Sequence, residues 1–357
     1  MSNTDYSTGG VRTVQAILKK TPDVGLELGD VSIITPGPRD VLVRVLKTGI
    51  CGTDRHIYEW DAWASNRIKP PLVAGHEFVG IVEDTGVGVH TVGPGDRVSG
   101  EGHIGCGHCY CCRTGATHIC DKVDILGVDV QGCFAPYVCM PESNIWRVDD
   151  RICDDQACLF DPFGNAMHTV MAQPISGKQV LVVGCGTIGL MAIGILAVGG
   201  VDKVIAVDPN PVKRDLAKTM GADEVLEQCD ATAVKDLTDR GGADVMLEMS
   251  GHPGAFVRAF DCVRNGGEVS LLGITTQPIP LLWSEQVIFK GLTIHGINGR
   301  RMFQTWYQCE SFLRRHPDLI EPLITHRLPF DRFEEGIHAM QGGDACKVVL
   351  DWQNAKA

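Results

Sequence analysis

Four cysteines within fifteen residues offer a single metal ion a complete set of ligands. They follow the spacing Cys-x2-Cys-x2-Cys-x7-Cys and are Cys106, Cys109, Cys112 and Cys120. Four thiolates from one short loop can close a tetrahedral shell around Zn²⁺, which leaves no position for water or substrate. Such a site stabilises a fold but performs no chemistry. A fifth thiol, Cys111, makes the register ambiguous, although the Cys109-Tyr-Cys111 spacing is too tight to be preferred.

A second group of residues could hold zinc with one position open. Cys51 lies in the stretch Gly-Ile-Cys-Gly-Thr-Asp-Arg-His, and the pair His76-Glu77 follows 25 residues later, between β-type segments. One thiolate, one imidazole and one carboxylate would leave the fourth position to a water or an alcohol. The alternative is that the His-Glu pair is simply part of the core.

A glycine-rich turn predicts a dinucleotide site. Gly184, Gly186 and Gly189 follow an apolar run and open a helical segment, and in this context they let the backbone approach a pyrophosphate at the helix N-terminus. Asp208 ends the next expected strand, where a carboxylate binds both ribose hydroxyls and repels a 2′-phosphate, which favours NAD over NADP. Asp208 could instead cap the following turn. Lys213 could pair with Asp208, lie over the adenine edge or be an ordinary solvated lysine.

Two patterns of secondary structure must position these residues. Residues 11–100 are rich in strands and glycine turns, and they predict a small, partly open β-barrel that carries the cysteine loop. From about residue 176, apolar runs alternate with helical segments and predict a doubly wound parallel sheet. The six expected strands are 178–184, 203–208, 224–226, 243–249, 267–273 and 292–297.

The helices of this second region have clear boundaries. One helix is expected over 187–198, and another begins at Pro211 and is ended by Gly221. After about residue 300 the rhythm is lost. A helix over 334–341 and a last strand over 347–352 indicate a return to the first domain.

Length and composition limit the class of protein. A chain of 357 residues is expected to form two domains, and 44% hydrophobic with 21% charged residues is typical of a globular protein. The formal charge of −12 argues against nucleic acid or an anionic membrane as partner. Fifteen cysteines, an odd number without a signal-like leader, favour reduced thiols in a cytoplasmic protein. No apolar run reaches the roughly 18 residues of a membrane span.

Several stretches of the chain carry a family resemblance. Besides the two zinc motifs they include Trp60-Asp-Ala-Trp63, Phe160-Asp-Pro-Phe-Gly-Asn165 and the segments 95–104, 299–306 and 324–327. Together they resemble the zinc-dependent medium-chain alcohol dehydrogenases over essentially the whole chain, and within that family they are most similar to the L-threonine 3-dehydrogenases. The zinc motifs are shared by the whole family, whereas the two aromatic stretches are more specific.

The resemblance implies a fold of class α/β in two domains. A GroES-like, partly open β-barrel with both zinc sites would occupy residues 1–165. A Rossmann doubly wound parallel sheet that binds NAD would occupy residues 166–300, and residues 301–357 would return to the catalytic domain.

The resemblance also implies roles for single residues. Cys51, His76 and Glu77 would form the catalytic zinc site. Thr53 and His56 would relay a proton, and Asp161 would support the metal as a nearby carboxylate. A structural histidine and a buried core carboxylate are the alternatives for the last two. The substrate pocket would be lined by His103, Trp60 and Trp63, of which the tryptophans could cover a substrate ammonium group or anchor their loop.

Eight positions would contact the cofactor by the same resemblance. They are Ile188, Asp208, Lys213, Leu272, Gly273, Ile274, Ile297 and Asn298. Lys213 stands where the family usually has arginine, and Asn298 replaces an aromatic residue. Both departures concern affinity for NAD more than the type of reaction.

The implied reaction is the NAD-dependent oxidation of the C3 hydroxyl of L-threonine to 2-amino-3-oxobutanoate. The alternatives are a sorbitol-type polyol dehydrogenase, a dehydrogenase of another β-hydroxy amino acid, and a non-catalytic NAD-binding relative. The resemblance further implies two zinc ions per chain and a homotetramer, for which the strand near 292–297 would be a pairing edge.

Overall fold

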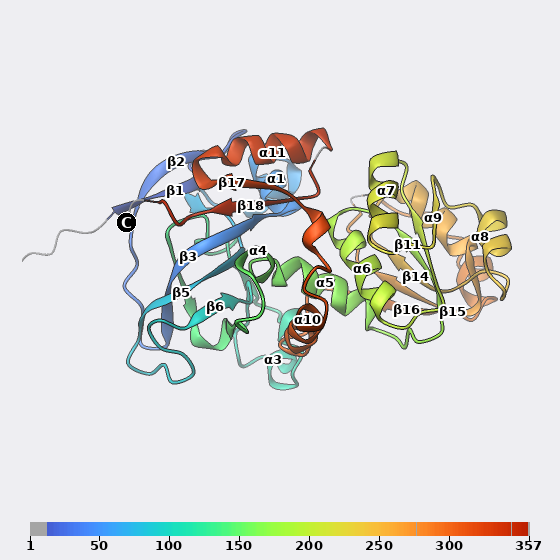
Figure 1. Ribbon diagram of the computed structural model, residues 1–357, viewed down its shortest axis with the longest axis horizontal. Coiled ribbons are helices and arrows are strands. Elements are labelled where there is room, and N and C mark those ends of the chain that lie inside the picture. The colour runs from blue at the N-terminus through green and yellow to red at the C-terminus, as the bar shows by residue number, and fades with distance from the viewer. Residues whose placement is uncertain (1–12, 276, 344, 356–357) are drawn as a thin grey trace, which may run out of the picture.

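Two sheet systems form the two ends of the molecule. The structure, a computed structural model, describes residues 13–275, 277–343 and 345–355. Figure 1 shows the barrel-like sheets at one end and the parallel sheet at the other, with helices α5 (Phe160–Val170) and α6 (Thr187–Val198) between them. The α/β fold class expected from the sequence is confirmed.

The barrel end is built mostly from antiparallel strands. β1 (Thr13–Lys19) pairs with β2 (Glu27–Ser32) and β4 (Leu72–Val73), and a second sheet runs in the order β10-β6-β5-β3-β18-β17, with β9 (Tyr137–Pro141) also paired to β3. The bounds of the remaining strands are β3 Asp40–Ile50, β5 Glu77–Thr85, β6 Arg97–Gly100, β10 Ile145–Arg147, β17 Ile324–Pro329 and β18 Lys347–Asp351.

The C-terminal segment completes the barrel end. β18 pairs antiparallel with β3, which sets Val348 opposite Ile50, and pairs parallel with β17. The predicted last strand is therefore confirmed to within one residue. The predicted helix over 334–341 is α11 (Phe333–Gly342), which packs on β17 and β18, while α10 (Gln304–Arg315) packs on α5.

The other end is a six-stranded parallel sheet in the order β13-β12-β11-β14-β15-β16. Its strands are β11 Gln179–Val183, β12 Lys203–Val207, β13 Glu224–Leu226, β14 Ala243–Glu248, β15 Val263–Leu271 and β16 Thr293–Gly296. All six coincide with expected strands. β15 begins four residues earlier than expected, because an irregularity in the register lets Val263 pair with Ala243.

Helices cover both faces of this sheet, so its strands are apolar on both sides. Every residue of β11 is buried. Val180 and Val182 join the hydrophobic cluster that contains α5 and α6, whereas Leu181 and Val183 join the cluster on the opposite face. The helices are α6, whose bounds are those expected, α7 (Pro211–Thr219), α8 (Ala231–Leu237) and α9 (Pro253–Asp261).

Short elements carry many of the predicted site residues. They are α1 Gly52–Glu59, α2 Ala62–Arg67, α3 Tyr110–Arg113, α4 Asp154–Ala157, β7 His103–Ile104 and β8 Asp124–Ile125. None of the helices within the described ranges is long and apolar enough to cross a bilayer.

Candidate active site

The structure brings Cys51, His76 and Glu77 together. One potential ligand atom from each lies within 4.8 Å of the other two. Cys51 is the residue that precedes α1, and Glu77 begins β5 directly after His76. The antiparallel pairing of β3 with β5 sets Gly49 opposite Glu77, so the start of α1 lies beside the start of β5. A side chain at Gly49 would clash with the Glu77 carboxylate, because an added Cβ would lie 2.1 Å from Glu77 Oε2.

A buried lysine from the C-terminal strand balances the charge of Glu77. Lys347 Nζ lies 2.7 Å from Glu77 Oε1 and 2.5 Å from Oε2, and it donates a hydrogen bond to the carbonyl of Ile50 at 2.9 Å. Both side chains are almost fully buried. Burial opposes the charge on Lys347, but the adjacent Glu77 carboxylate raises the pKa of Lys347 above its usual value. No sequence pattern indicated Lys347, which is 270 residues from Glu77 along the chain.

Asp54 supports the same cluster from inside α1. Its Oδ2 accepts a hydrogen bond from the Cys51 amide at 2.8 Å, and its Oδ1 lies 4.0 Å from His76 Nδ1. Burial raises the pKa of Asp54. Asp54 Oδ1 and His76 Nδ1 are buried atoms that find no hydrogen-bond partner among the described residues.

This donor set fits a divalent cation. Burial disfavours the imidazolium form of His76, yet attraction to Cys51 raises the pKa of His76 to about 10. The cluster therefore has a field strong enough to attract positive charge. A zinc ion would satisfy that field and would take sulfur, nitrogen and oxygen ligands of this kind, with the histidine as a neutral ligand.

A buried network of ion pairs lies next to the cluster. Arg300 Nη1 is 2.7 Å from Asp161 Oδ1, and Arg300 Nε donates to Glu101 Oε2 at 2.8 Å. Trp306 Nε1 donates to the same Glu101 oxygen at 2.9 Å. Desolvation acts against the Glu101 carboxylate, but Arg300 holds the pKa of Glu101 far below its ordinary value. Asp161 is thus paired with Arg300, and it is not part of the three-residue group found within the described ranges.

Glu101 and Arg300 were given no role from the sequence, although both lie in the stretches that carry the resemblance. His103 belongs to their network. Its Nδ1 lies 3.1 Å from Glu101 Oε1 and 2.9 Å from Arg300 Nη2. The sequence carries no local signal for this pair, because its members are 199 residues apart.

The proposed relay residues lie along α1. Cys51 Sγ is 3.8 Å from Thr53 Oγ1, and His56 follows Thr53 by three residues, which places both on one face of the helix. His56 Nδ1 lies 2.7 Å from Asp61 Oδ2. Asp61 was not assigned a role from the sequence.

The two tryptophans of the substrate expectation differ in their contacts. Trp60 has a left-handed backbone conformation (φ 52°), and the ammonium group of Lys19 lies over its ring, 4.6 Å from the centroid. Trp63 is 40% exposed and meets the ring of His56 edge-on at 6.1 Å. Trp60 therefore anchors the turn between α1 and α2, while Trp63 is available to solvent beside His56.

The structure also gathers the cysteine quartet. The sulfur atoms of Cys106, Cys109, Cys112 and Cys120 lie within 4.8 Å of one another, and Cys111 is outside this group. Backbone N–H groups of the loop donate to the sulfurs. The Cys109 nitrogen lies 3.4 Å from Cys106 Sγ, and the Cys112 nitrogen lies 3.4 Å from Cys109 Sγ. The N–H bond from Cys112 lowers the pKa of Cys109 to about 6, which favours the thiolate that zinc requires, whereas burial raises the pKa of Cys112 to about 12.

The dinucleotide turn has the expected backbone. Gly184 has a positive φ of 94°, and a Cβ on Gly189 would lie 2.0 Å from the carbonyl of Gly184, so the helix and the turn approach too closely for any side chain. Asp208 accepts backbone hydrogen bonds from Cys185 at 2.8 Å and from Asn210 at 2.9 Å. The bond from Cys185 holds Asp208 beside the glycine-rich turn. The bond from Asn210 means that Asp208 also caps the turn after β12, which was the alternative role considered from the sequence.

The other expected cofactor positions lie around the ends of the parallel strands. Lys213 donates to the carbonyl of Ala345 at 3.2 Å rather than to Asp208. Ile274 and Asn298 are exposed, while Ile188 packs against the core. Gly273 N and Leu272 N each donate to Glu248 O at 3.0 Å, and Ile297 N donates to Leu271 O at 2.9 Å. Arg214, which was not predicted, donates to the carbonyl of Asp208 at 2.7 Å.

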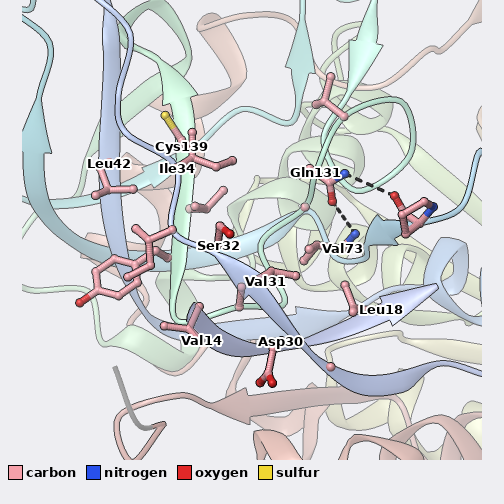
Figure 2. A pocket seen from close by; sticks show the side chains of 18 of the residues that line it. Val14, Leu18, Asp30, Val31, Ser32, Ile34, Leu42, Val73, Gln131 and Cys139 are labelled. Atoms are coloured by element: carbon pink, nitrogen blue, oxygen red, sulfur yellow. Dashed lines mark hydrogen bonds between the residues drawn. The ribbon is translucent and has the colours of Figure 1, made fainter. Parts of the chain in front are cut away.

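A large groove lies apart from both clusters. Its volume is about 870 Å³, and it opens on the barrel between β2 and β9. Figure 2 shows Val31, Ile34 and Cys139 among the side chains that line it. Its lining contains no zinc-cluster residue and no residue of the dinucleotide turn, so we relate it to the open side of the barrel and not to catalysis.

Comparison with known proteins agrees with this geometry. The family profile described as alcohol dehydrogenase GroES-like domain matches residues 37–150, and the profile described as zinc-binding dehydrogenase matches residues 187–315. The L-threonine 3-dehydrogenase of Pyrococcus horikoshii is 45% identical over 94% of this chain and 97% of its own length, and that of Bacillus licheniformis is 44% identical over 94% and 98%. An alcohol dehydrogenase from Escherichia coli CFT073, solved in complex with NADH, superimposes with a TM-score of 0.87 at 28% identity, over 96% of this chain and 100% of that one.

Proposed function

The chain belongs to the zinc-binding alcohol dehydrogenases, and on that premise we propose that it oxidises the C3 hydroxyl of L-threonine to 2-amino-3-oxobutanoate with NAD. The observation that carries the proposal is the buried Cys51-His76-Glu77 cluster in a chain 45% identical to an L-threonine 3-dehydrogenase. A non-catalytic relative is disfavoured, because such a protein has no need for a buried, unsatisfied donor set.

Zinc would be held by Cys51, His76 and Glu77, and when bound it would act as a Lewis acid that lowers the pKa of the substrate hydroxyl. NAD supplies the acceptor for the hydride that leaves C3. The chain supplies position and charge. Lys347 neutralises Glu77, Asp54 faces the ring of His76, and Arg300 forms an ion pair with Asp161 beside them. The four thiols of the 106–120 loop would hold a second, structural zinc.

The proton of the hydroxyl must leave a buried site. Thr53, next to Cys51, offers a hydroxyl that can accept one proton while donating another. His56 is partly exposed and is suited to deliver the proton to water. Thr53 and His56 therefore form the proposed relay.

The substrate would lie between the metal cluster and His103. Threonine is a zwitterion, so its pocket needs a donor for the carboxylate and an acceptor or an aromatic face for the ammonium. His103 is held by contacts with Glu101 and Arg300, so its ring is the polar group proposed for the substrate carboxylate on that side of the pocket. Trp63 is the exposed aromatic residue of the α1–α2 region and is the better candidate of the two tryptophans for the ammonium.

The dinucleotide turn and Asp208 support a preference for NAD. Both oxygens of Asp208 already accept backbone hydrogen bonds, so its carboxylate is fixed where the adenine ribose of a bound cofactor would lie. Asp208 would accept further bonds from the ribose hydroxyls and repel a 2′-phosphate.

We propose that the protein is a cytoplasmic homotetramer. β16 is the last strand of its sheet, and the turn before it exposes four large apolar side chains: Leu282, Trp283, Ile288 and Phe289. An apolar patch beside an open strand edge suits pairing with a second copy. All fifteen cysteines in the described part of the chain are unpaired, which suits a reducing compartment.

The decisive experiment is a steady-state panel with L-threonine, L-serine, a 3-hydroxy amino acid with a larger side chain, sorbitol and a simple secondary alcohol, each with NAD and with NADP. We expect the highest kcat/KM for L-threonine with NAD, and about two zinc ions per chain. Sorbitol as the best substrate would replace the proposal by a polyol dehydrogenase. Asp208→Ala should narrow the preference for NAD over NADP, and an unchanged ratio would remove Asp208 from cofactor selection.

A further inference from the structure

We propose that Asp61 is a positioning residue that holds the ring of His56 in the one neutral tautomer able to accept a proton. The observation is the 2.7 Å contact between His56 Nδ1 and Asp61 Oδ2. The inference rests on the proposed function, because it gives His56 the role of passing the proton to water.

The tautomer follows from the chemistry of the two groups. Asp61 Oδ1 accepts the amide hydrogen of Ala64 at 2.9 Å and so caps α2. The pKa of Asp61 is lowered mainly by the hydrogen bond from the Ala64 amide and further by the one from His56. The carboxylate is therefore ionised at neutral pH. An ionised carboxylate can only accept hydrogen bonds. The contact at Nδ1 therefore requires a proton on Nδ1, which leaves the lone pair of the neutral ring on Nε2.

The turn between α1 and α2 is built to make this contact. Trp60 adopts its left-handed conformation at the end of α1, which reverses the chain and returns Asp61 to the side of His56. Lys19 stabilises the turn. Its ammonium group lies over the ring of Trp60 and donates a hydrogen bond to the carbonyl of Gly25 at 2.9 Å. The ring of Trp63 meets the His56 ring edge-on.

The step that Asp61 supports is a balanced proton transfer. As the hydroxyl of Thr53 takes the proton of the substrate hydroxyl, it gives up its own proton toward His56, where a bond forms to Nε2 and makes an imidazolium. Asp61 stabilises that charge without taking the proton from Nδ1. The 45% exposed side chain of His56 then loses the Nε2 proton to water, which restores the neutral ring.

Asp61→Asn tests the inference because it separates the two contacts of Asp61. The oxygen of the new amide can still accept from Ala64 and cap α2, since asparagine is as good a cap as aspartate. Its NH2 group would donate to Nδ1, and the ring proton would move to Nε2. Asp61→Ser is the matched variant, because serine also caps a helix but leaves Nδ1 without a fixed partner.

The first readout is ¹⁵N NMR of histidine-labelled enzyme without substrate, with the His56 signals assigned by their loss in His56→Ala. We expect the Nδ1–H tautomer in the wild type, the Nε2–H tautomer in Asp61→Asn, and a mixture in Asp61→Ser. An Nε2–H tautomer in the wild type, or no change in Asp61→Asn, would overturn the inference.

The second readout is kinetic. We expect Asp61→Asn to lower kcat by about tenfold, which is less than the roughly hundredfold minimum typical of a positioned acid–base group, because Asp61 acts only through His56. The KM for NAD, the zinc content and the melting temperature should be unchanged. In a His56→Ala background the same substitution should have no further effect, because Asp61 acts through His56. An equal loss in both backgrounds would overturn the inference.

The two proposals can fail separately. The NMR measurement needs no turnover, so a wild-type enzyme that does not oxidise L-threonine would overturn the proposed function alone. The kinetic cycle would then be run with whichever alcohol the substrate panel identifies.

Discussion

The two cysteine clusters of this protein are built in opposite ways. The quartet at 106–120 comes from one loop, and its sulfurs accept hydrogen bonds from the backbone of that same loop. The trio of Cys51, His76 and Glu77 comes from two chain segments, is largely buried, and depends on Lys347 from the far end of the chain.

This difference separates support from chemistry. The quartet carries its own electrostatic environment, so its field does not depend on the rest of the fold. The trio contains a buried ring nitrogen, His76 Nδ1, that has no hydrogen-bond partner among the described residues, and the charge of Glu77 is balanced by Lys347 from the surrounding core. Changes to the trio should therefore appear in catalysis and in the stability of the core, and changes to the quartet in the stability of one loop.

The largest expected effect is that of Cys51→Ser. Loss of the thiolate should remove the metal of the trio and with it several kcal/mol of transition-state stabilisation, so kcat should fall by on the order of a thousandfold. Zinc analysis should show the loss of about one ion per chain. The fold should survive, because the substitution leaves the buried pair of Lys347 and Glu77 intact.

Cys153→Ser is the matched control for that variant. Cys153 is an exposed cysteine in front of α4 and belongs to neither cluster. Its activity and zinc content should equal those of the wild type. Full activity in Cys51→Ser would remove the trio from the mechanism.

Lys347→Met should give the next largest effect. It leaves the Glu77 carboxylate buried without its partner, and breaking a buried ion pair in this way typically costs about 3–5 kcal/mol of stability. Urea unfolding measures the loss, which should be smaller with zinc present, because the metal offers Glu77 another partner. Lys20→Met removes an exposed pair with Glu27 and should cost less than about 1 kcal/mol. Equal losses in the two variants would contradict a buried role for Lys347.

Lys347 also marks the limit of what the sequence could predict. The parallel sheet, its six strands and the glycine turn could be predicted, because buried parallel strands and a tight turn leave local patterns in the chain. The spacing of four cysteines is equally local. The partners of the trio are not local: Lys347 and Glu77 meet only because β18 pairs with β3, and β3 in turn with β5. No spacing rule reaches across 270 residues.

The Arg300–Glu101 pair was missed for the same reason, since 199 residues separate its members. Asp61 was missed for another reason. It is only five residues from His56, but their contact depends on the left-handed conformation of Trp60. A non-glycine residue gives no sign of that conformation in the sequence.

Cys109→Ser and Cys111→Ser together test the cysteine quartet as a self-contained structural zinc site. Cys109→Ser should lose about one zinc per chain and melt at a temperature about 5–10 °C lower, because the loop loses its closure. Cys111→Ser should keep both zinc ions, since Cys111 lies outside the quartet. Loss of zinc from Cys111→Ser instead would mean that the register of the loop is different.

The smallest effect should come from Asp54→Asn, which replaces one carboxyl group beside the trio and changes no ligand. The asparagine oxygen can still accept from the Cys51 amide, so α1 keeps its start, but His76 Nδ1 loses the carboxyl group that lies 4.0 Å away. Residues behind a metal ligand typically change metal affinity about tenfold to a hundredfold. Titration against a chelator should therefore show about tenfold weaker zinc binding at the trio and unchanged binding at the quartet. Weakening of both sites alike would mean that Asp54 acts on the fold as a whole, and the contrast between a self-contained and an embedded metal site would then fail at this residue.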